Sequence, residues 1–148
     1  KTLNMPGGIK AVSEYGKLKF VRAGGENKPF CYPLTVGEER YLPEADSFII
    51  IKNEEKTGKN SASKIYFYAD ENSEFSVRSR KNGDICFPCG MTGKKKLSDL
   101  FTDIKLERDK RDAVPIVTCN GEIVWVGGIR RDRRFLNGKT LMSCEIRK

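Results

Sequence analysis

The chain has 148 residues, enough for one domain or two small ones with a substantial buried core. Its hydrophobic share of 38%, without any apolar run of membrane-spanning length, excludes a transmembrane helix and favours a soluble globular protein. The net charge of +8 favours a polyanionic partner, and the absence of histidine removes the commonest catalytic base.

The sequence begins at Lys1 with neither an initiator Met nor a signal-like apolar stretch, so we expect a fragment of a longer, cytoplasmic protein. Residues 1–77 carry 11 Lys and Arg against 11 Asp and Glu, whereas residues 78–148 carry 17 against 9. The whole basic excess therefore lies in the second half. A charge excess of this kind is typical of a nucleic-acid contact, although a basic surface also serves solubility alone.

The first half is predicted to be β-rich. Residues 8–23 are expected to form two strands around a turn at Tyr15-Gly16, and the β-branched and aromatic runs at 47–53 and 64–70 two more. The segment 53–63 contains a single apolar residue, Ala62, and is predicted to be a solvated, mobile connection.

A further strand is predicted at 75–80, followed by a turn at Asn82-Gly83. Cys86 and Cys89 then form a CxxC pair, which could supply half of a zinc site or a redox pair. Because the chain has five cysteines and no second CxxC, we favour reduced thiols that act as small buried hydrophobes, and no bound metal is predicted.

From Lys94 onward the apolar spacing becomes helical. Four residues recur at i, i+3, i+4 and i+7, which predicts one apolar face on a helix of about three turns: Leu97, Leu100, Phe101 and Ile104. A short charged helical turn is expected at 107–112, with i,i+4 pairs of opposite charge and an end at Pro115.

The segment 116–126, IVTCNGEIVWV, predicts an antiparallel hairpin with Asn120-Gly121 in a type I′ turn, which needs positive φ at both central positions. Consecutive apolar residues in its second strand indicate that both faces are covered. The sole tryptophan, Trp125, is therefore expected in the core, with stacking on a nucleotide base as the alternative.

Strands grouped ahead of a helix and a final hairpin indicate an α+β fold instead of a parallel βαβ protein. We expect a β-rich N-terminal half followed by a small α+β module with one amphipathic helix and an antiparallel hairpin.

Three lysines, Lys94, Lys95 and Lys96, stand at the start of the predicted helix, where the helix dipole disfavours cations. A departure from a local rule is typical of functional sites, so unpaired helix N–H groups and three ammonium groups predict a phosphate site. A solvated lysine run is the alternative. A nucleotide-binding P-loop is excluded, because Pro88 stands where a glycine is needed and Lys95 where Ser or Thr is needed.

A second basic cluster follows two glycines at 127–128. Guanidinium groups hold phosphate bidentately, but in an extended segment only about half of the side chains face one ligand surface. Phe135 is expected to anchor this segment to the core. The cluster consists of Arg130, Arg131, Arg133 and Arg134. No serine, cysteine or lysine has a recognisable activating partner, so no catalytic residue is predicted.

Several motifs in sequence order carry a resemblance. They are VRSRKNGD at 77–84, PCGMTGKKKLSDLFTDIKL at 88–106, RD and VP at 111–115, EIVWVGGIR at 122–130 and RF at 134–135. This series resembles the C-terminal region of bacterial tRNA(Ile)-lysidine synthetase, and NMPGGIKAVSEYGKLKF at 4–20 is similar to the family's preceding β-rich segment.

The resemblance implies a ligase that uses ATP to join lysine to the wobble cytidine of an isoleucine tRNA. In that family the chemistry lies in an N-terminal PP-loop domain with a Ser-Gly-Gly-x-Asp-Ser motif, which is absent here. The chain is therefore expected to be inactive alone and to need no cofactor, with ATP and lysine as substrates of the full-length enzyme. Its implied partners are isoleucine tRNA and its own catalytic domain, with no membrane.

The same resemblance implies a β-rich substrate-binding segment at 1–76 and a tRNA-binding domain at 77–148. Three basic strips supply the expected tRNA-facing residues: Arg78, Arg80, Lys81, Lys94, Lys95, Lys96, Lys105, Arg111, Arg130 and Arg134. A noncatalytic module that docks its basic face on its own catalytic domain is the main alternative. A metal-binding module built on the CxxC pair is a further one.

Three positions depart from the family pattern, which commonly has a basic residue at Phe87, Leu at Cys89 and Pro at Gly127. The first difference disfavours a phosphate contact at Phe87. The second supports Cys89 as a hydrophobe. The third predicts a looser exit from the hairpin.

Overall fold

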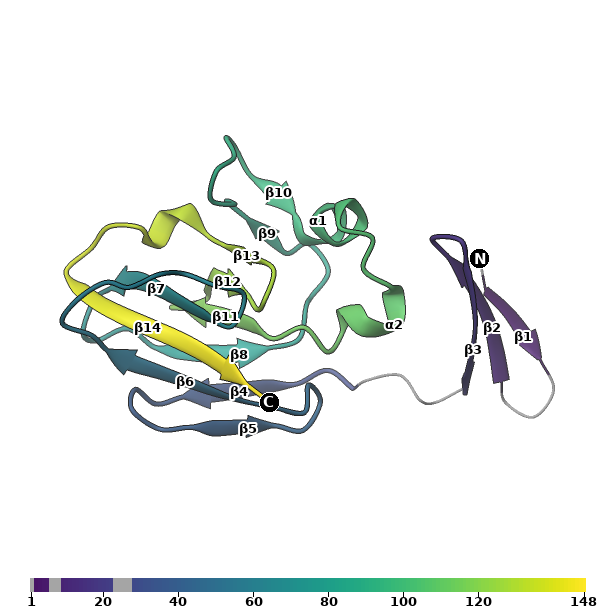
Figure 1. Cartoon of the computed structure of the whole chain (residues 1–148), viewed down its shortest axis with the longest axis horizontal. Coiled ribbons are helices and arrows are strands. Elements are labelled where there is room, and N and C mark those ends of the chain that lie inside the picture. The colour runs from purple at the N-terminus through teal and green to yellow at the C-terminus, as the bar shows by residue number, and fades with distance from the viewer. Residues whose placement is uncertain (1, 6–8, 23–27) are drawn as a thin grey trace.

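A computed structural model describes residues 2–5, 9–22 and 28–148 (Figure 1). Its first three strands form an antiparallel sheet: β1 (Thr2–Met5), β2 (Ile9–Glu14) and β3 (Lys17–Arg22). Tyr15 and Gly16 join β2 to β3 with φ of 52° and 77°. The two strands and the turn predicted within residues 8–23 are confirmed.

The main body contains two further antiparallel sheets that pack face to face. The strand order in the larger sheet is β13-β12-β11-β8-β4, and in the smaller one β5-β6-β14-β7. The larger sheet consists of β4 (Cys31–Leu34), β8 (Phe75–Arg78), β11 (Ile116–Cys119), β12 (Glu122–Val126) and β13 (Arg130–Arg131). The smaller sheet consists of β5 (Arg40–Leu42), β6 (Ser47–Asn53), β7 (Lys64–Ala69) and β14 (Thr140–Arg147). The predicted strands at 47–53, 64–70 and 75–80 are thus confirmed as β6, β7 and β8.

The core between these sheets follows from the alternation of apolar side chains along the strands. Ile49 and Ile51 of β6 and Phe67 of β7 meet Val77 of β8 and Trp125 of β12, and all five are at most 3% exposed. Phe135 packs against the edge of this core. The predictions for Trp125 as a core residue and for Phe135 as an anchor are confirmed.

Strands from both halves of the sequence share each of these sheets. The C-terminal strand β14 lies between β6 and β7, and β8 pairs with β4 on one side and β11 on the other. The boundary predicted between residues 76 and 77 falls inside β8. The two-part division remains a prediction about function, whereas the packing of residues 28–148 is continuous across it.

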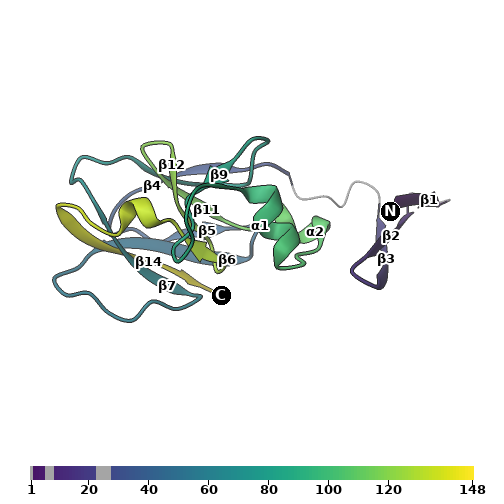
Figure 2. The ribbon, with the colours of Figure 1, turned by 90° about the horizontal axis from the view of Figure 1, so that it is seen from above.

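A second layer covers the outer face of the five-stranded sheet (Figures 1 and 2). It contains β9 (Ile85–Cys86), β10 (Lys95–Lys96), α1 (Leu97–Asp103) and α2 (Arg108–Arg111). Leu97, Leu100 and Phe101 are at most 2% exposed and pack on Ile116 and Ile123 of the sheet. The amphipathic helix is confirmed.

The end of this helix differs from the prediction. α1 has seven residues, about two turns, and Ile104 is its C-cap residue with 44% of its surface exposed. Lys105 follows with a φ of 56°, so the chain has left the helix there. The prediction of three turns and of Ile104 on the buried face is wrong.

The hairpin predicted at 116–126 is confirmed in its strands and in its turn. Asn120 and Gly121 have φ of 50° and 85°, as a type I′ turn requires. The four apolar residues at 123–126 are at most 4% exposed, so the second strand is covered on both faces. The exit, however, is tight: Gly127 donates its N–H to the carbonyl of Pro115 at 2.8 Å, and a Cβ there would lie 2.7 Å from that oxygen. The looser exit expected from the family pattern is wrong.

The segment 53–63 is exposed except for half-buried Glu54 and Asn60, which confirms that it is solvated. Of the five cysteines, Cys86, Cys119 and Cys144 are buried. Within the described part of the chain no helix is long and apolar enough to cross a membrane.

Candidate nucleic-acid interface

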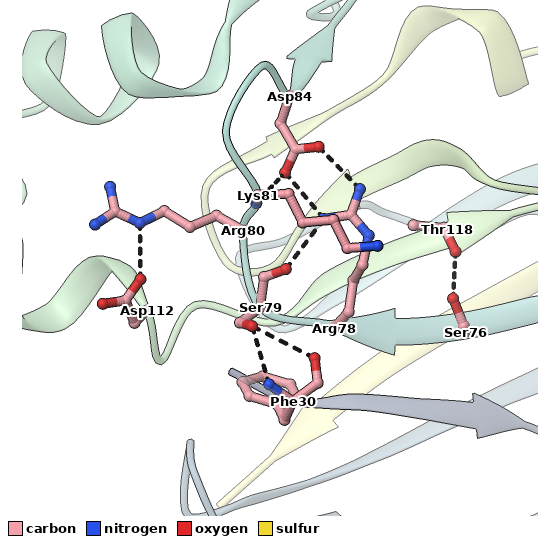
Figure 3. A network of polar contacts seen from close by, with 9 residues as sticks. All are labelled: Phe30, Ser76, Arg78, Ser79, Arg80, Lys81, Asp84, Asp112 and Thr118. Atoms are coloured by element: carbon pink, nitrogen blue, oxygen red, sulfur yellow. Dashed lines mark hydrogen bonds and ion pairs between the residues drawn. The ribbon is translucent and has the colours of Figure 1, made fainter. Parts of the chain in front are cut away.

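The turn that follows β8 is organised by an ion pair between Arg78 and Asp84 (Figure 3). The guanidinium Nη1 and Nη2 atoms donate to the two carboxylate oxygens at 2.9 and 3.0 Å, and Nη1 also donates to the carbonyl of Ser79 at 3.0 Å. The Lys81 N–H donates to the same carboxylate at 2.7 Å. Because the side chains of the pair are only 10% and 11% exposed, Arg78 fixes the turn and directs three guanidinium hydrogen bonds to groups of the protein.

The same turn is fixed to neighbouring elements on both sides. The Ser79 N–H donates to the carbonyl of Phe30 at 2.9 Å, and the Phe30 N–H donates to the Ser79 hydroxyl at 3.0 Å. Arg80 points the other way and donates from Nε to Asp112 at 2.9 Å (Figure 3). Asp112 is the C-cap residue of α2, so the turn is connected to the helical layer.

The lysines at 94–96 lead through a short strand directly into α1, whose N-cap residue is Lys96. Lys95 and Lys96 form β10, which pairs with Cys86 and Ile85 of β9. The first helical N–H, that of Leu97, donates to the carbonyl of Asp84 at 2.9 Å and is unavailable to a phosphate. The phosphate site at the helix N-terminus stays a prediction, with Lys96 as the N-cap residue of α1 and with sheet pairing to β9 fixing the segment that leads into the helix.

The strand geometry separates the three lysines. Lys95 is half-buried and its ammonium group forms an ion pair with Asp103 at the end of α1. Lys94 and Lys96 are exposed. Among the described residues, neither of their ammonium groups has a side-chain or backbone partner.

Lys96 lies across a polar cavity from the turn after β8. The cavity has a volume of about 270 Å³, and Arg80, Lys81 and Lys96 line it together with the carboxylates of Asp84 and Asp112. We call Arg80, Lys81 and Lys96 the basic rim. Asp84 is neutralised by Arg78, and the ammonium groups of Lys81 and Lys96 have no partner within the described ranges, so the rim has a net positive charge.

Arg134, which follows β12 and β13, is paired with acidic groups of the protein, unlike the two lysines of the rim. Asp132 has a fully buried carboxylate that accepts from the N–H of Phe87 at 2.9 Å and from Arg134 Nε and Nη2 at 3.0 and 2.9 Å. Arg134 also donates to Glu122 at 2.7 Å, and its guanidinium carbon lies 4.3 Å from the centre of the Phe87 ring. We call Asp132, Arg134 and Phe87 the Asp132 clamp.

The clamp joins the β9 strand to the short helix η2 (Arg133–Phe135). Arg133 adds to it by donating to the carbonyls of Met91 and Gly93 at 3.3 and 2.7 Å. Bidentate pairing and stacking on an aromatic ring are the strongest uses of a guanidinium, and here both are intramolecular. Arg134 is therefore a structural residue in this conformation.

Three other predicted tRNA-facing residues lie apart from the rim. Arg111 is 6% exposed and donates to the carbonyl of Leu106 and to the hydroxyl of Tyr15 at 2.9 and 2.8 Å. Lys105 is exposed just beyond α1. Arg130 of β13 is partly buried, and its Nε atom is buried without an acceptor in the described part of the protein.

Four of the five thiols are not activated as nucleophiles. Burial is the main cause that raises the pKa of the Cys86, Cys89 and Cys119 thiols above the usual value for cysteine, and the pKa of the fully buried Cys144 is also raised. A raised pKa keeps a thiol protonated at neutral pH, whereas attack and metal binding need the thiolate. No group of three or more His, Cys, Asp or Glu that could hold a metal ion is present in the residues that the structure describes.

Sequence reasoning missed the two carboxylates that organise this surface, Asp84 and Asp132. Asp84 lies six residues from Arg78, and that spacing follows from the turn geometry. Asp132 lies two residues before Arg134, where its side chain also accepts the Arg134 N–H at 2.9 Å. The pattern Asp-x-Arg after a predicted strand was the available signal for the second case.

Comparison with known proteins places this surface in context. Residues 75–146 match a family model described as the TilS substrate C-terminal domain. The chain is similar to tRNA(Ile)-lysidine synthases of Symbiobacterium thermophilum, with 30% identity over 90% of the chain and 30% of the relative, and of Clostridium perfringens, with 33% identity over 99% and 34%. It thus spans about a third of the length of these curated relatives.

A solved structure shares the fold. The crystal structure of a TilS C-terminal domain superposes with a TM-score of 0.69 and 28% sequence identity, over 81% of this chain and 97% of that one. The mostly antiparallel sheet architecture with few helices is therefore common to both.

Proposed function

Because the chain belongs to the tRNA(Ile)-lysidine synthase family, as part of its C-terminal region, we propose that it binds the tRNA on which the whole enzyme acts. In this proposal the full-length protein is the ATP-dependent ligase that joins lysine to the wobble cytidine of isoleucine tRNA in the cytoplasm. In the same proposal, ATP and lysine are substrates of the catalytic domain, and the present chain contributes contacts to tRNA and takes no part in the reaction.

The observation that supports this proposal is the basic rim. Lys81 and Lys96 come from segments 15 residues apart and line one cavity with Arg80, and the ammonium groups of the two lysines have no intramolecular partner in the described structure. Exposed, unpaired ammonium groups are available to neutralise phosphates and to release counterions. A-form RNA hides its base edges in a deep groove, so contacts to backbone charge and shape fit such a surface.

Among the ten residues expected to face tRNA, the rim residues and the exposed Lys94 and Lys105 are now the strongest candidates. Lys95, Arg78, Arg111 and Arg134 are held by other groups of the protein. We propose that these four position the surface and do not touch RNA. Arg130 belongs to a separate cavity that is described below.

The test uses the full-length enzyme carrying Lys81→Ala and Lys96→Ala together. Loss of two phosphate contacts should weaken tRNA binding by about tenfold at moderate salt and reduce the slope of log K against log salt by about 2. Filter binding at several salt concentrations measures both quantities. Thermal unfolding should not change, because neither ammonium group has a partner in the described structure.

The matched control is Lys52→Ala with Lys56→Ala, which removes two exposed lysines from β6 and from the segment that follows it. It should change the slope by far less than the rim variant. An identical titration for the rim variant and the unmodified enzyme would contradict the proposal. Salt-insensitive association of the chain with its own catalytic domain, without tRNA binding, would favour the docking-module alternative.

The expected inactivity of the isolated chain is tested by supplying it to cells depleted of the full-length enzyme. It should not restore lysidine formation, because the chain holds no PP-loop motif. Restoration of lysidine by the chain alone would contradict this part of the proposal.

A further inference from the structure

A second cavity lies at the opposite end of the hairpin from its turn, where β13 approaches the loop before β7. It has a volume of about 460 Å³, and its lining includes Asn60, Ser61, Cys89, Trp125, Arg130 and Arg131. The two walls come close at Gly128, where a Cβ would lie 3.6 Å from the carbonyl oxygen of Ala62. No residue in this lining belongs to the basic rim.

The charge of this cavity is not balanced. Arg130 and Arg131 both line it, and its lining contains no carboxylate, whereas the cavity of the basic rim includes Asp84 and Asp112. The nearest carboxylate in sequence, that of Asp132, is already bound by Arg134 and by the N–H of Phe87. Neither Arg130 nor Arg131 has an ion-pair partner among the described residues.

One donor of Arg130, a residue that lines this cavity, is buried and unsatisfied among the described residues. The Nε atom of Arg130 is removed from solvent and finds no acceptor in the described part of the chain. A buried donor without an acceptor is rare in folded proteins, so the Arg130 guanidinium keeps hydrogen-bonding capacity that the described part of the protein does not use. The thiol of Cys89 does not act as an anionic acceptor, because burial raises its pKa and keeps it neutral.

The opposite wall of the cavity is formed by the loop before β7 and contributes the side-chain amide of Asn60. The side-chain oxygen of Asn60 accepts the N–H of Tyr66 at 2.7 Å, which fixes the amide and leaves its NH₂ group as a donor. The loop itself is held by Ser61, whose hydroxyl accepts from the N–H groups of Ser63 and Lys64 at 3.3 and 3.2 Å. The wall that carries the Asn60 amide is therefore fixed before any ligand binds.

We propose that this cavity is a binding site for one phosphate group, held by the guanidinium groups of Arg130 and Arg131 and by the amide of Asn60. A phosphate has enough acceptor oxygens for all three side chains, and arginine forks match its geometry. The phosphate belongs either to an RNA or to a small free ligand. The site is separate from the basic rim, so this proposal does not depend on the rim contacting tRNA.

The experiment titrates inorganic phosphate into the 148-residue chain at constant ionic strength, with chloride as the compensating ion. The readouts are the ¹H–¹⁵N signal of Arg130 Nε and the fluorescence of Trp125, the single tryptophan, which lines the same cavity. We expect a saturable shift of both signals with a Kd on the order of millimolar. Arg131→Gln and Asn60→Ala should each weaken binding severalfold, and Arg130→Gln at least tenfold.

Controls separate this site from the rim and from a folding defect. Lys81→Ala with Lys96→Ala should leave phosphate binding unchanged, and Arg130→Lys should keep the charge but bind more weakly than the unmodified chain. Far-UV circular dichroism of each variant reports whether it folds, and Asn60→Ala provides a readout if the arginine variants do not.

The source of the phosphate follows from competition in the full-length protein. If tRNA displaces inorganic phosphate from Arg130, the site takes an RNA phosphate, and if tRNA and phosphate bind together, the site takes a small phosphorylated ligand. Both results support the proposal. A folded chain whose Arg130 and Trp125 signals respond to phosphate no more than to chloride, up to about 50 mM, would overturn it.

Discussion

The basic rim and the Asp132 clamp contain similar side chains but use them in opposite ways. In the clamp, Arg134 has a buried carboxylate, an exposed carboxylate and an aromatic ring as partners. In the rim, the ammonium groups of Lys81 and Lys96 have no partner within the described ranges, although the two residues line one cavity. A run of basic residues therefore does not identify a binding surface. The distribution of carboxylates around it decides which charges remain available.

The largest expected effect concerns the clamp. Replacement of Asp132 by Ala removes a fully buried carboxylate, which leaves the Phe87 N–H without its acceptor and the Arg134 guanidinium with Glu122 as its remaining carboxylate partner. The free energy of unfolding should fall by about 3 kcal/mol, since breaking a buried ion pair exposes the full desolvation cost of its partner. Urea denaturation of the chain measures this change.

The control for the clamp is Glu122→Ala, which removes the other carboxylate that contacts Arg134. Glu122 is 57% exposed, so its loss should change stability by no more than about 0.5 kcal/mol. If Asp132→Ala and Glu122→Ala lowered the free energy of unfolding equally, the buried carboxylate would contribute no more than an exposed one. The clamp would then not differ from the rim as a structural element.

The next effect tests whether Arg78 belongs with the clamp or with the rim. Arg78→Ala should lower the free energy of unfolding by about 2 kcal/mol, because Asp84 loses a bidentate partner while both side chains are about nine-tenths buried. Arg80→Ala is the control, since Arg80 and Asp112 are 29% and 39% exposed and should contribute about 0.5 kcal/mol or less. A loss of tRNA affinity in Arg78→Ala without loss of stability would place Arg78 among the RNA contacts instead.

The fold was predictable where the signal is local. The type I′ turn at Asn120-Gly121 and the face made by Leu97, Leu100 and Phe101 follow from backbone preference and period alone. Ile104 was assigned to the same face because its spacing fits, but the helix ends one residue earlier. The position of β14 between β6 and β7 depends on pairing across many residues, and no local pattern specifies it.

The site was predictable in composition but not in arrangement. The lysines at 94–96 were expected at a helix start, and Lys96 is the N-cap residue of α1, but the pairing of Lys95 and Lys96 with β9, about ten residues earlier in the chain, was not predicted. Arg78 and Lys81 read as one basic strip in the sequence, but Asp84 engages only the first through its guanidinium. These differences arise from tertiary contacts, which charge patterns do not report.

The smallest expected effect concerns Asp112, the acidic residue that lines the same cavity as the basic rim. Asp112→Asn removes the negative charge that pairs with Arg80, so it should weaken that contact and raise the net charge of the cavity. We expect tRNA to bind the full-length enzyme about threefold more tightly, with a slightly steeper salt dependence. Glu39→Gln adds the same charge beside β5, away from the rim lining, and should have a smaller effect. If both variants tighten binding equally, net charge alone governs affinity, and the arrangement of the rim around its cavity has no special role in binding.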